Sequence, residues 1–333
     1  MMFGRKRKTP CYGLQILDSQ AKIVELVLSQ QRVRVTKLHT ASFSGELVKN
    51  GKILDEDAVA KQLKTHVAQL GIAGAQVHLT IPTSSIVLRR SVFAALKDRE
   101  LRNLIDVELY GEGQLPFKNP VFDFIRLGEV KPAQPREDAA GKKSGVADKK
   151  EEVLIFATPQ EVVDSYVNVV KAADLQPVAV DLAPLALYRL LVRSMKLAGE
   201  FPAKRFMLLL AESDYAEISI FADGIPVFLR ALPVNAYSVL DADGDKTEVY
   251  SRNLAMELSR VINYYKYSVA GDQEDIKDLY LLGERELAEK LPAYLEDVCP
   301  GTVRKLPIGS LLLNEEQFYH SYAVPIGLAM KGA

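Results

Sequence analysis

The stretch YGLQILDSQAKIVEL, residues 12–26, has the pattern of two strands joined by a tight turn. Its apolar residues alternate at Leu14 and Ile16 before the letters DSQ and return after them, which is typical of a hairpin with a buried face. A hairpin that grips phosphates needs a glycine, so that backbone N–H groups can approach them, and an acidic residue that organises a metal ion. This stretch has Gln15 and Leu17 at its centre. The residues alone leave open whether it is a nucleotide site, the remains of one or only a hairpin.

The residues that follow extend this hairpin into a β-β-β-α-β unit. We predict strands at 12–18, 21–29 and 32–40, and then a helix that begins at Asp55, a favourable N-cap, and ends before Gly71. The stretch QVHLTIP supplies the next strand, because its apolar residues again alternate.

The same order recurs in the second half of the chain. RFMLLLAES is an apolar strand, and AEISIFADGIPVFLRAL contains two more strands around Asp223-Gly224, a strong hairpin signal. We predict a long helix over 247–268 and a further strand in DLYLLGE. A repeated unit of this size predicts two similar domains that face each other across a cleft.

The segment between the repeats predicts a smaller set of elements. KDRELRNLIDVELYG has the pattern of an amphipathic helix, and Thr158, Pro159 and Glu161 have the spacing of a capping box that starts another helix. From 131 to 150 the sequence is rich in charged residues, glycine and proline and lacks aromatic residues. This composition predicts a mobile loop between two strands.

Composition places the chain among ordinary globular proteins. Of its 333 residues, 48% are hydrophobic and 26% are charged, and the formal net charge is -1, so no global field favours nucleic acid as a partner. Cys11 and Cys299 are far apart, which argues against a disulfide framework or a zinc site. No apolar run reaches the roughly 18 residues that a membrane-spanning helix needs. No ligand spacing connects the four histidines, which are His39, His66, His78 and His320.

Further runs follow one another along the chain: HLTIPTSSIVLRRSVF, ELRNLIDVELYGEGQLPF, VFDFIRLGEV, VLIFATPQEVVDSYVNVVKAADLQPVAVDLAPLALYRLL, DGIPVFLRALP, AMELSRVINYYKYS, LYLLGERE and YAVPIGLAM. As an ordered set they resemble the PilM family of type IV pilus assembly proteins, over nearly the whole chain except 131–150. The resemblance implies an α/β, actin-like fold with two ribonuclease-H-like domains around a nucleotide cleft and a small inserted α+β subdomain. On that basis we expect a first domain over 1–200 with the insertion at about 88–152, a second domain over 205–318, and a C-terminal segment, 319–333, that returns to the first.

The resemblance also implies a partner. Members of the PilM family bind the short N-terminal cytoplasmic tail of PilN, a single-span membrane protein, beside the inserted subdomain. We therefore expect a cytoplasmic scaffold, peripheral at the inner face of the cell membrane, that connects this membrane complex to motor components of the pilus. We expect the tail to lie along SSIVLRR and LPF and to add main-chain hydrogen bonds to a strand edge. The residues expected at this groove are Arg89, Arg90, Leu115 and Phe117.

The family's first phosphate hairpin reads approximately G-I-D-I-G-S-x-x-x-K, and this chain departs from it at both chemical positions. Gln15 stands where an acidic residue organises the metal, and Leu17 stands where a glycine approaches the phosphates. Ser19 and Lys22 remain. Lys22 fits two interpretations, an exposed lysine of the hairpin or a phosphate contact.

The family's second hairpin reads approximately V-D-I-G-x-x-x-T, and here Leu210 replaces the acid, Glu212 the glycine and Ala216 the threonine. Of the third motif, a glycine-rich turn near the adenosine, Gly283 remains. Together these departures predict a degenerate actin-like protein with no catalytic residues and no cofactor.

Two alternatives stay open at this point. The first is an active actin-like ATPase of pilus assembly with ATP and Mg²⁺ as cofactors, in which Asp18, Glu212 and Asp214 rebuild a magnesium site. The second is a type II secretion scaffold of the same fold. Such scaffolds differ mainly by a transmembrane helix after the domain, and this chain ends at GLAMKGA without one.

Overall fold

The structure is a computed structural model that describes residues 10–29, 31–111, 115–130, 149–212, 215–233, 246–270, 275–309, 311–313 and 319–332. Residue contacts divide the chain into two compact units. The smaller unit is Ser85–Val163, and the larger unit combines Met1–Ser84 with Asp164–Ala333.

The first sheet of the larger unit contains the predicted hairpin at its centre. In the order in which they pair, its strands are β10 (Gln176–Asp181), β6 (Gln76–Thr80), β1 (Cys11–Ile16), β2 (Gln20–Ser29) and β3 (Arg32–Ser42). β2 is antiparallel to both β1 and β3, whereas β1, β6 and β10 are parallel. A small hairpin, β4 (Val48–Lys49) and β5 (Lys52–Ile53), lies between β3 and the first helix in sequence.

The predicted first helix is confirmed as α1 (Glu56–Leu70). The Asp55 side chain accepts a hydrogen bond from the Ala58 N–H at 2.9 Å, and Gly71 ends the helix in the left-handed region at φ 65°. The predicted capping box at the next helix is wrong, because Thr158 and Pro159 belong to a strand and α3 (Gln160–Ala172) begins after them.

The second sheet of the larger unit repeats the order of the first. Its strands are β13 (Ile225–Pro233), β12 (Tyr215–Ala222), β11 (Arg205–Ala211), β14 (Asp278–Gly283) and β15 (Thr302–Lys305). The predicted turn is confirmed, since Asp223 and Gly224 have φ values of 49° and 81°, both in the left-handed region that such a hairpin turn requires. The predicted helix over 247–268 is α5 (Lys246–Tyr264) followed by a π-helix, Tyr265–Ala270.

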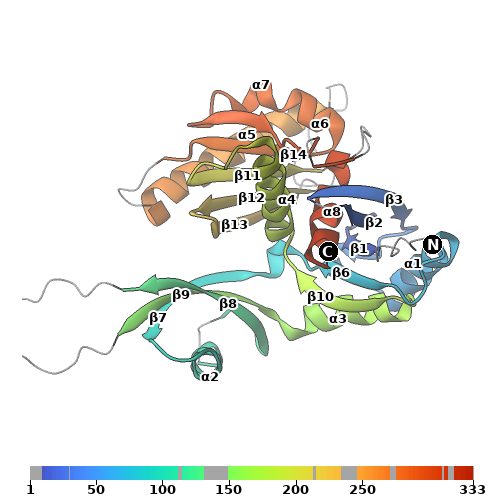
Figure 1. Cartoon of the computed structure of the whole chain (residues 1–333), viewed down its shortest axis with the longest axis horizontal. Coiled ribbons are helices and arrows are strands. Elements are labelled where there is room, and N and C mark those ends of the chain that lie inside the picture. The colour runs from blue at the N-terminus through green and yellow to red at the C-terminus, as the bar shows by residue number, and fades with distance from the viewer. Residues whose placement is uncertain are drawn as a thin grey trace, which may run out of the picture. The chain divides into compact units, whose positions relative to one another are not determined.

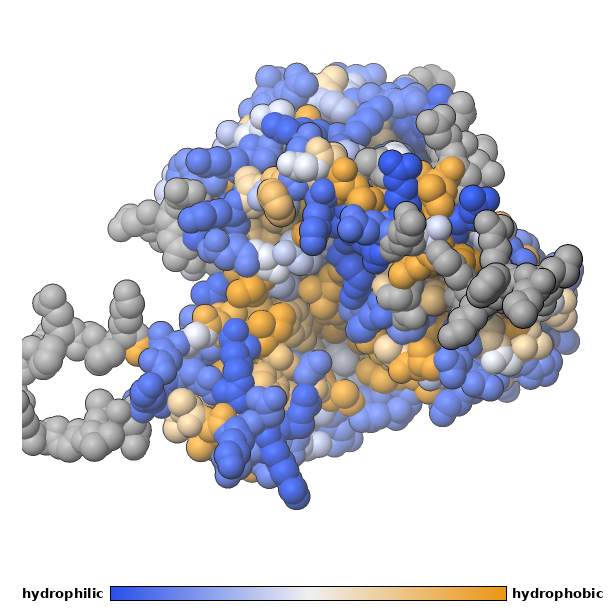
Figure 2. All heavy atoms as spheres, in the orientation of Figure 1, coloured by the Kyte–Doolittle hydropathy of each residue, from blue (hydrophilic) through white to orange (hydrophobic). Residues whose placement is uncertain are grey.

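One face of the second sheet is covered by helices. The apolar residues of α5, of α6 (Arg285–Lys290) and of α7 (Pro292–Leu295) pack with Met207, Leu209 and Ile218 of the sheet in one buried cluster. Hydrophilic side chains predominate at the top of Figure 2, where Figure 1 places α6 and α7. The chain therefore buries the apolar side of these helices and exposes their polar side.

The other face of the second sheet shares a core with the first sheet. Two helices, α4 (Ala183–Ala198) and α8 (Ala323–Ala329), lie between the sheets and contribute to one cluster with residues of β2 and β11 (Figure 1). α8 packs tightly on β1, because an added Cβ atom at Gly13 would lie 1.9 Å from the carbonyl oxygen of Pro325. This contact gives Gly13 a packing role, and the residue needs no phosphate to explain it.

The smaller unit is an antiparallel sheet with one helix. Its strands pair in the order β7 (Val87–Ala94), β9 (Lys150–Pro159), β8 (Pro120–Glu129), and α2 (Asp98–Leu109) supplies Leu101, Ile105 and Leu109 to its core. The unit extends beyond the predicted 88–152 on both sides. The predicted loop 131–150 joins β8 to β9, but Lys150 is already part of β9 and 131–148 lies outside the described residues. In the described part of the chain, no helix is long and apolar enough to cross a membrane.

Candidate functional site

Equivalent backbone hydrogen bonds close the two repeated hairpins. The Leu17 N–H donates to the Gln20 carbonyl at 2.7 Å, and the Glu212 N–H donates to the Tyr215 carbonyl at 2.9 Å. Leu17 and Glu212 therefore occupy equivalent positions. By the same register Lys22 of β2 is equivalent to Glu217 of β12, because Gln15 pairs with Lys22 and Leu210 pairs with Glu217.

Lys22 joins the two hairpins, and the interpretation of an exposed hairpin lysine is wrong. Its side chain is buried, and Nζ lies 2.6 Å from Oε2 of Glu212, which is buried as well. Nζ also donates to the carbonyl of Ser321, just before α8, at 2.9 Å. One ammonium group therefore binds the first hairpin, the second hairpin and the C-terminal segment together.

A second contact between the hairpins involves Gln15. Its Nε2 donates to the Tyr215 hydroxyl at 2.9 Å, and only 4% of Gln15 is exposed. Leu210, at the equivalent position of β11, is buried in the core that the two sheets share. Neither position that holds an acid in the family motif has a charge here.

The predicted alternative of a rebuilt magnesium site needs three carboxylates, and two of them already have partners within the protein. Asp18 accepts hydrogen bonds from the N–H groups of Asn50 and Gly51 at 2.6 and 2.8 Å, and so anchors the turn between β4 and β5. Glu212 is held by Lys22. Asp214 lies outside the described residues, whose His, Cys, Asp and Glu side chains form no group of three or more that suits a metal ion.

Ser19 and Gly283 have backbone roles. Ser19 is exposed, and its carbonyl accepts a hydrogen bond from the Phe43 N–H at 2.8 Å. Gly283 ends β14 with φ 120°, and an added Cβ atom would lie 1.8 Å from the carbonyl oxygen of Ala211. Close strand packing therefore accounts for the one glycine that remains of the third motif.

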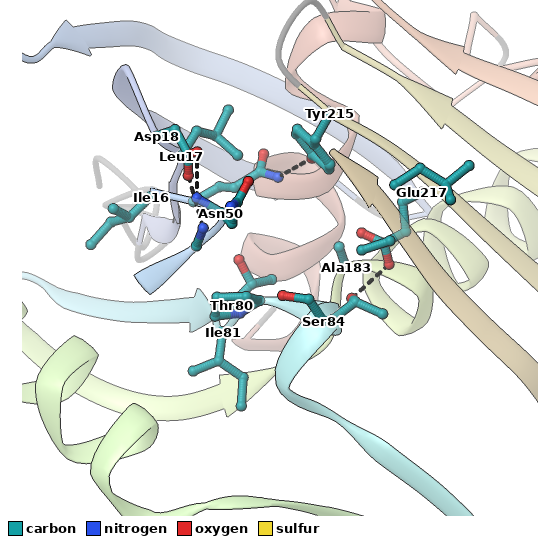
Figure 3. A pocket seen from close by; sticks show the side chains of 16 residues that line it. Ile16, Leu17, Asp18, Asn50, Thr80, Ile81, Ser84, Ala183, Tyr215 and Glu217 are labelled. Carbon is teal, nitrogen blue, oxygen red and sulfur yellow. Dashed lines mark hydrogen bonds between the residues drawn. The ribbon is translucent and has the colours of Figure 1, made fainter. Parts of the chain in front are cut away.

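A pocket of about 260 Å³ opens between the two halves of the larger unit, beside these contacts. Described side chains of both sheets line it, among them Leu17, Asp18, Thr80, Tyr215 and Glu217 (Figure 3). The sequence predicted a cleft between two similar domains, and the structure has a pocket there with mainly apolar walls.

Glu217 is the residue of this pocket that sequence reasoning missed. It lies on β12 with 4% of its surface exposed, and the Thr83 hydroxyl donates to its Oε1 at 2.7 Å. Burial raises the pKa of Glu217 to about 7, and the hydrogen bond from Thr83 opposes that rise only in part. Lys22, the equivalent residue of the first hairpin, forms an ion pair with Glu212 of the second. For Glu217 the residue equivalent to that partner is the apolar Leu17. Glu217 therefore forms no ion pair with any described residue.

Two histidines that the sequence leaves unconnected also come together. His39 Nε2 and His66 Nδ1 lie 2.9 Å apart, from β3 and α1. Burial, and then the charge of His66, lower the pKa of His39. The pair connects α1 to the strand at the edge of the sheet.

In the smaller unit, the four predicted groove residues have partners within the unit. Arg89 forms an ion pair with Glu108 of α2 at 2.9 Å, and Arg90 forms one with Glu152 of β9 at 3.6 Å. Leu115 and Phe117 are partly buried against the core of the unit and line a cavity of about 500 Å³.

A row of exposed apolar side chains on α2, the apolar stripe, leads to this cavity. Leu104, Val107 and Tyr110 are all exposed, 72% in the case of Val107, and their spacing places them along one side of the helix. Tyr110 also lines the cavity, together with Leu109 and Pro116. The sequence contained this signal, because these residues fall between the apolar positions that face the core.

Several solved structures are similar to this chain to different extents. A solved PilM-PilN type IV pilus biogenesis complex is similar with a TM-score of 0.73 and 20% sequence identity, over 98% of this chain and 99% of that chain. The ethanolamine utilization protein EutJ from Carboxydothermus hydrogenoformans has a TM-score of 0.47 and 12% identity over 97% and 90% of the two chains. The cytoplasmic domain of EpsL, from the type II secretion system of Vibrio cholerae, has a TM-score of 0.46 and 10% identity over 97% and 95%.

A comparison with curated proteins gives no match. The fold is that of actin-like ATPases, with two mixed sheets and a small antiparallel subdomain, and the predicted fold class is thereby confirmed. The family model of the type IV pilus assembly protein PilM matches residues 13–234, well over half of the sequence. The chain therefore belongs to the PilM family of type IV pilus assembly proteins.

Proposed function

We propose that this chain is a cytoplasmic scaffold of a type IV pilus assembly machine that docks the N-terminal tail of a PilN-like membrane protein and hydrolyses no nucleotide. It is recruited to the inner face of the membrane by that tail and presents the complex to motor components of the pilus. Membership of the PilM family carries the proposal. The similar solved complex, in which a PilM protein is paired with PilN, supports the choice of partner.

The smaller unit offers a suitable surface for a peptide tail. The exposed stripe of Leu104, Val107 and Tyr110 runs into the cavity lined by Leu115 and Phe117. Exposed apolar residues beside a concave pocket are typical of sites that bind a peptide through a few anchoring side chains. Arg89 and Arg90, which are already paired, take a smaller part in this proposal than the sequence suggested.

Titration of the full chain with a synthetic peptide of the partner's cytoplasmic tail tests this site. We expect Tyr110→Ala to weaken binding at least about tenfold, or roughly 1.4 kcal/mol, because an exposed tyrosine beside a pocket is a frequent anchor of such interfaces. The replacement spares the core, whereas a charge at Leu115 or Phe117 would also disturb folding. Phe201→Ser is the matched control, since it removes an exposed aromatic residue from the larger unit. Intact binding by Tyr110→Ala together with loss in Val92→Lys would instead place the tail along β7.

The contacts between the hairpins support the absence of nucleotide turnover. The Lys22 ammonium group is engaged by Glu212 and by the Ser321 carbonyl, so a phosphate could reach it only by approaching a buried carboxylate. A second negative charge beside Glu212 is unfavourable in a buried, weakly screened site. Leu17 also places a side chain where the motif has none.

We therefore expect no change in the melting temperature on addition of millimolar ATP with Mg²⁺, and no release of phosphate. Differential scanning fluorimetry checks the first expectation, with EDTA in place of Mg²⁺ as the control. A ligand at 100 times its dissociation constant adds about 2.7 kcal/mol of stability, which such a measurement detects readily. A magnesium-dependent rise in melting temperature would contradict this part of the proposal and leave the docking of the tail untouched.

A further inference from the structure

The pocket of the larger unit contains a carboxylate that no described side chain neutralises. Oε1 of Glu217 accepts the Thr83 hydroxyl at 2.7 Å, and the other oxygen points toward the interior of the pocket (Figure 3). An isolated carboxylate in an apolar, buried site is unfavourable unless it takes up a proton or meets a cation. A cationic ligand would neutralise the Glu217 carboxylate and donate a hydrogen bond to the oxygen that Thr83 does not contact.

The charges around the pocket also favour a cation. Glu217 and Asp18 are the charged residues among the described residues that line it, and both are acidic. The ammonium group of Lys22, which joins the two hairpins, is already paired with Glu212. A phosphate or carboxylate ligand would therefore meet only like charge in the described part of the lining.

Size and polarity limit the ligand further. The pocket holds about 260 Å³, and Leu17, Ile81 and Leu232 make much of its wall apolar. We propose that this pocket binds a small organic cation, an amine, amidine or guanidine with a compact apolar body, with Glu217 as its counter-ion. The site is independent of the peptide surface on the smaller unit. A free metabolite and the side chain of a lysine or arginine offer the same chemistry.

Three probes of nearly equal shape test the charge preference on the full chain. They are benzamidine, which is cationic, benzamide, which is neutral, and benzoate, which is anionic. Isothermal titration calorimetry should show millimolar or tighter binding of benzamidine and at least about tenfold weaker binding of the other two. Glu217→Gln keeps the size of the side chain and an acceptor for Thr83, and should bring benzamidine to the level of benzamide. Glu46→Gln, which removes an exposed carboxylate from a pair with Lys49, should leave the preference intact.

A second variant separates the site from effects on folding. Ala231→Leu narrows the pocket from β13 and leaves the carboxylate in place, so it should also weaken benzamidine binding. The capped tripeptide Ala-Arg-Ala distinguishes the two sources of the cation, since it binds as well as benzamidine only if the pocket admits a side chain on a backbone. Equal binding of the three probes, a preference for benzoate, no binding of benzamidine, or binding that Glu217→Gln leaves unchanged would overturn the proposal.

Discussion

Replacement of Lys22 by methionine should lower the free energy of unfolding by about 3–5 kcal/mol, the usual cost of leaving one member of a buried ion pair without its partner. The Glu212 carboxylate would remain in a site where only 2% of the residue is exposed, and the Ser321 carbonyl would lose its donor. Urea unfolding of the purified chain measures this loss. Because Nζ joins both hairpins and the C-terminal segment, we also expect earlier proteolysis near α8.

A double variant distinguishes the ion pair from simple packing. Lys22→Met combined with Glu212→Leu removes both charges, and replacement of a buried pair by apolar residues of similar size is often neutral or stabilising. The double variant should therefore recover most of the stability that Lys22→Met loses. Lys49→Met breaks the exposed pair with Glu46 and should change the unfolding curve little. A double variant that is less stable than either single one would show that the two side chains act independently.

The elements that local patterns determine could be predicted from the sequence. Asp55 caps α1 by accepting a hydrogen bond from an N–H of the first turn, and Gly71 ends that helix. Asp223-Gly224 closes a hairpin between adjacent strands. Each of these features depends on residues a few positions apart. The strand order of the second sheet then follows from the repeat, because it copies that of the first.

The contacts that define the cleft depend on residues that are distant in sequence. Lys22 and Glu212 are 190 positions apart, and the hairpin pattern alone does not tell whether the lysine meets a carboxylate, a phosphate or water. A weaker signal was nevertheless present. Glu217 is the single charge of a strand that is otherwise mainly apolar, and Lys22 lies in a similar strand whose one other charge is Glu25. A charge in such a strand must find a partner or shift its pKa. In the structure Lys22 is paired with Glu212, and burial raises the pKa of Glu217.

The start and end of the smaller unit were harder to predict for a different reason. Thr158 and Pro159 have the composition of a helix start, yet they complete the pairing of β9 with β8, and the Thr158 hydroxyl lies 3.1 Å from that of Ser85. Tertiary pairing thus overrides a local capping preference. The same holds for Arg89, which we expected at the peptide groove and which forms an ion pair with Glu108 of α2.

Glu217 predicts a pH dependence of stability that is opposite to that of a typical surface carboxylate. Its pKa is about 7 in the folded chain, above the value of 4.5 for an unperturbed glutamate, so the folded state binds this proton more tightly than the unfolded state. The stabilisation is fully present below pH 4.5 and is lost as the pH rises to about 7. A difference of this size corresponds to about 3 kcal/mol.

The comparison of wild type with Glu217→Gln isolates this contribution, because the other titrating groups are common to both chains. The glutamine keeps the hydrogen bond with Thr83 and has no proton to lose. We expect the variant to gain about 3 kcal/mol of unfolding free energy relative to wild type between pH 4 and pH 8, measured by urea unfolding at closely spaced pH values. Glu46→Gln controls for the loss of one negative charge at an exposed position. A stability difference between wild type and Glu217→Gln that stays constant over this range would mean that the Glu217 carboxyl ionises at its ordinary pKa, and that the pocket is more open to water than its walls indicate.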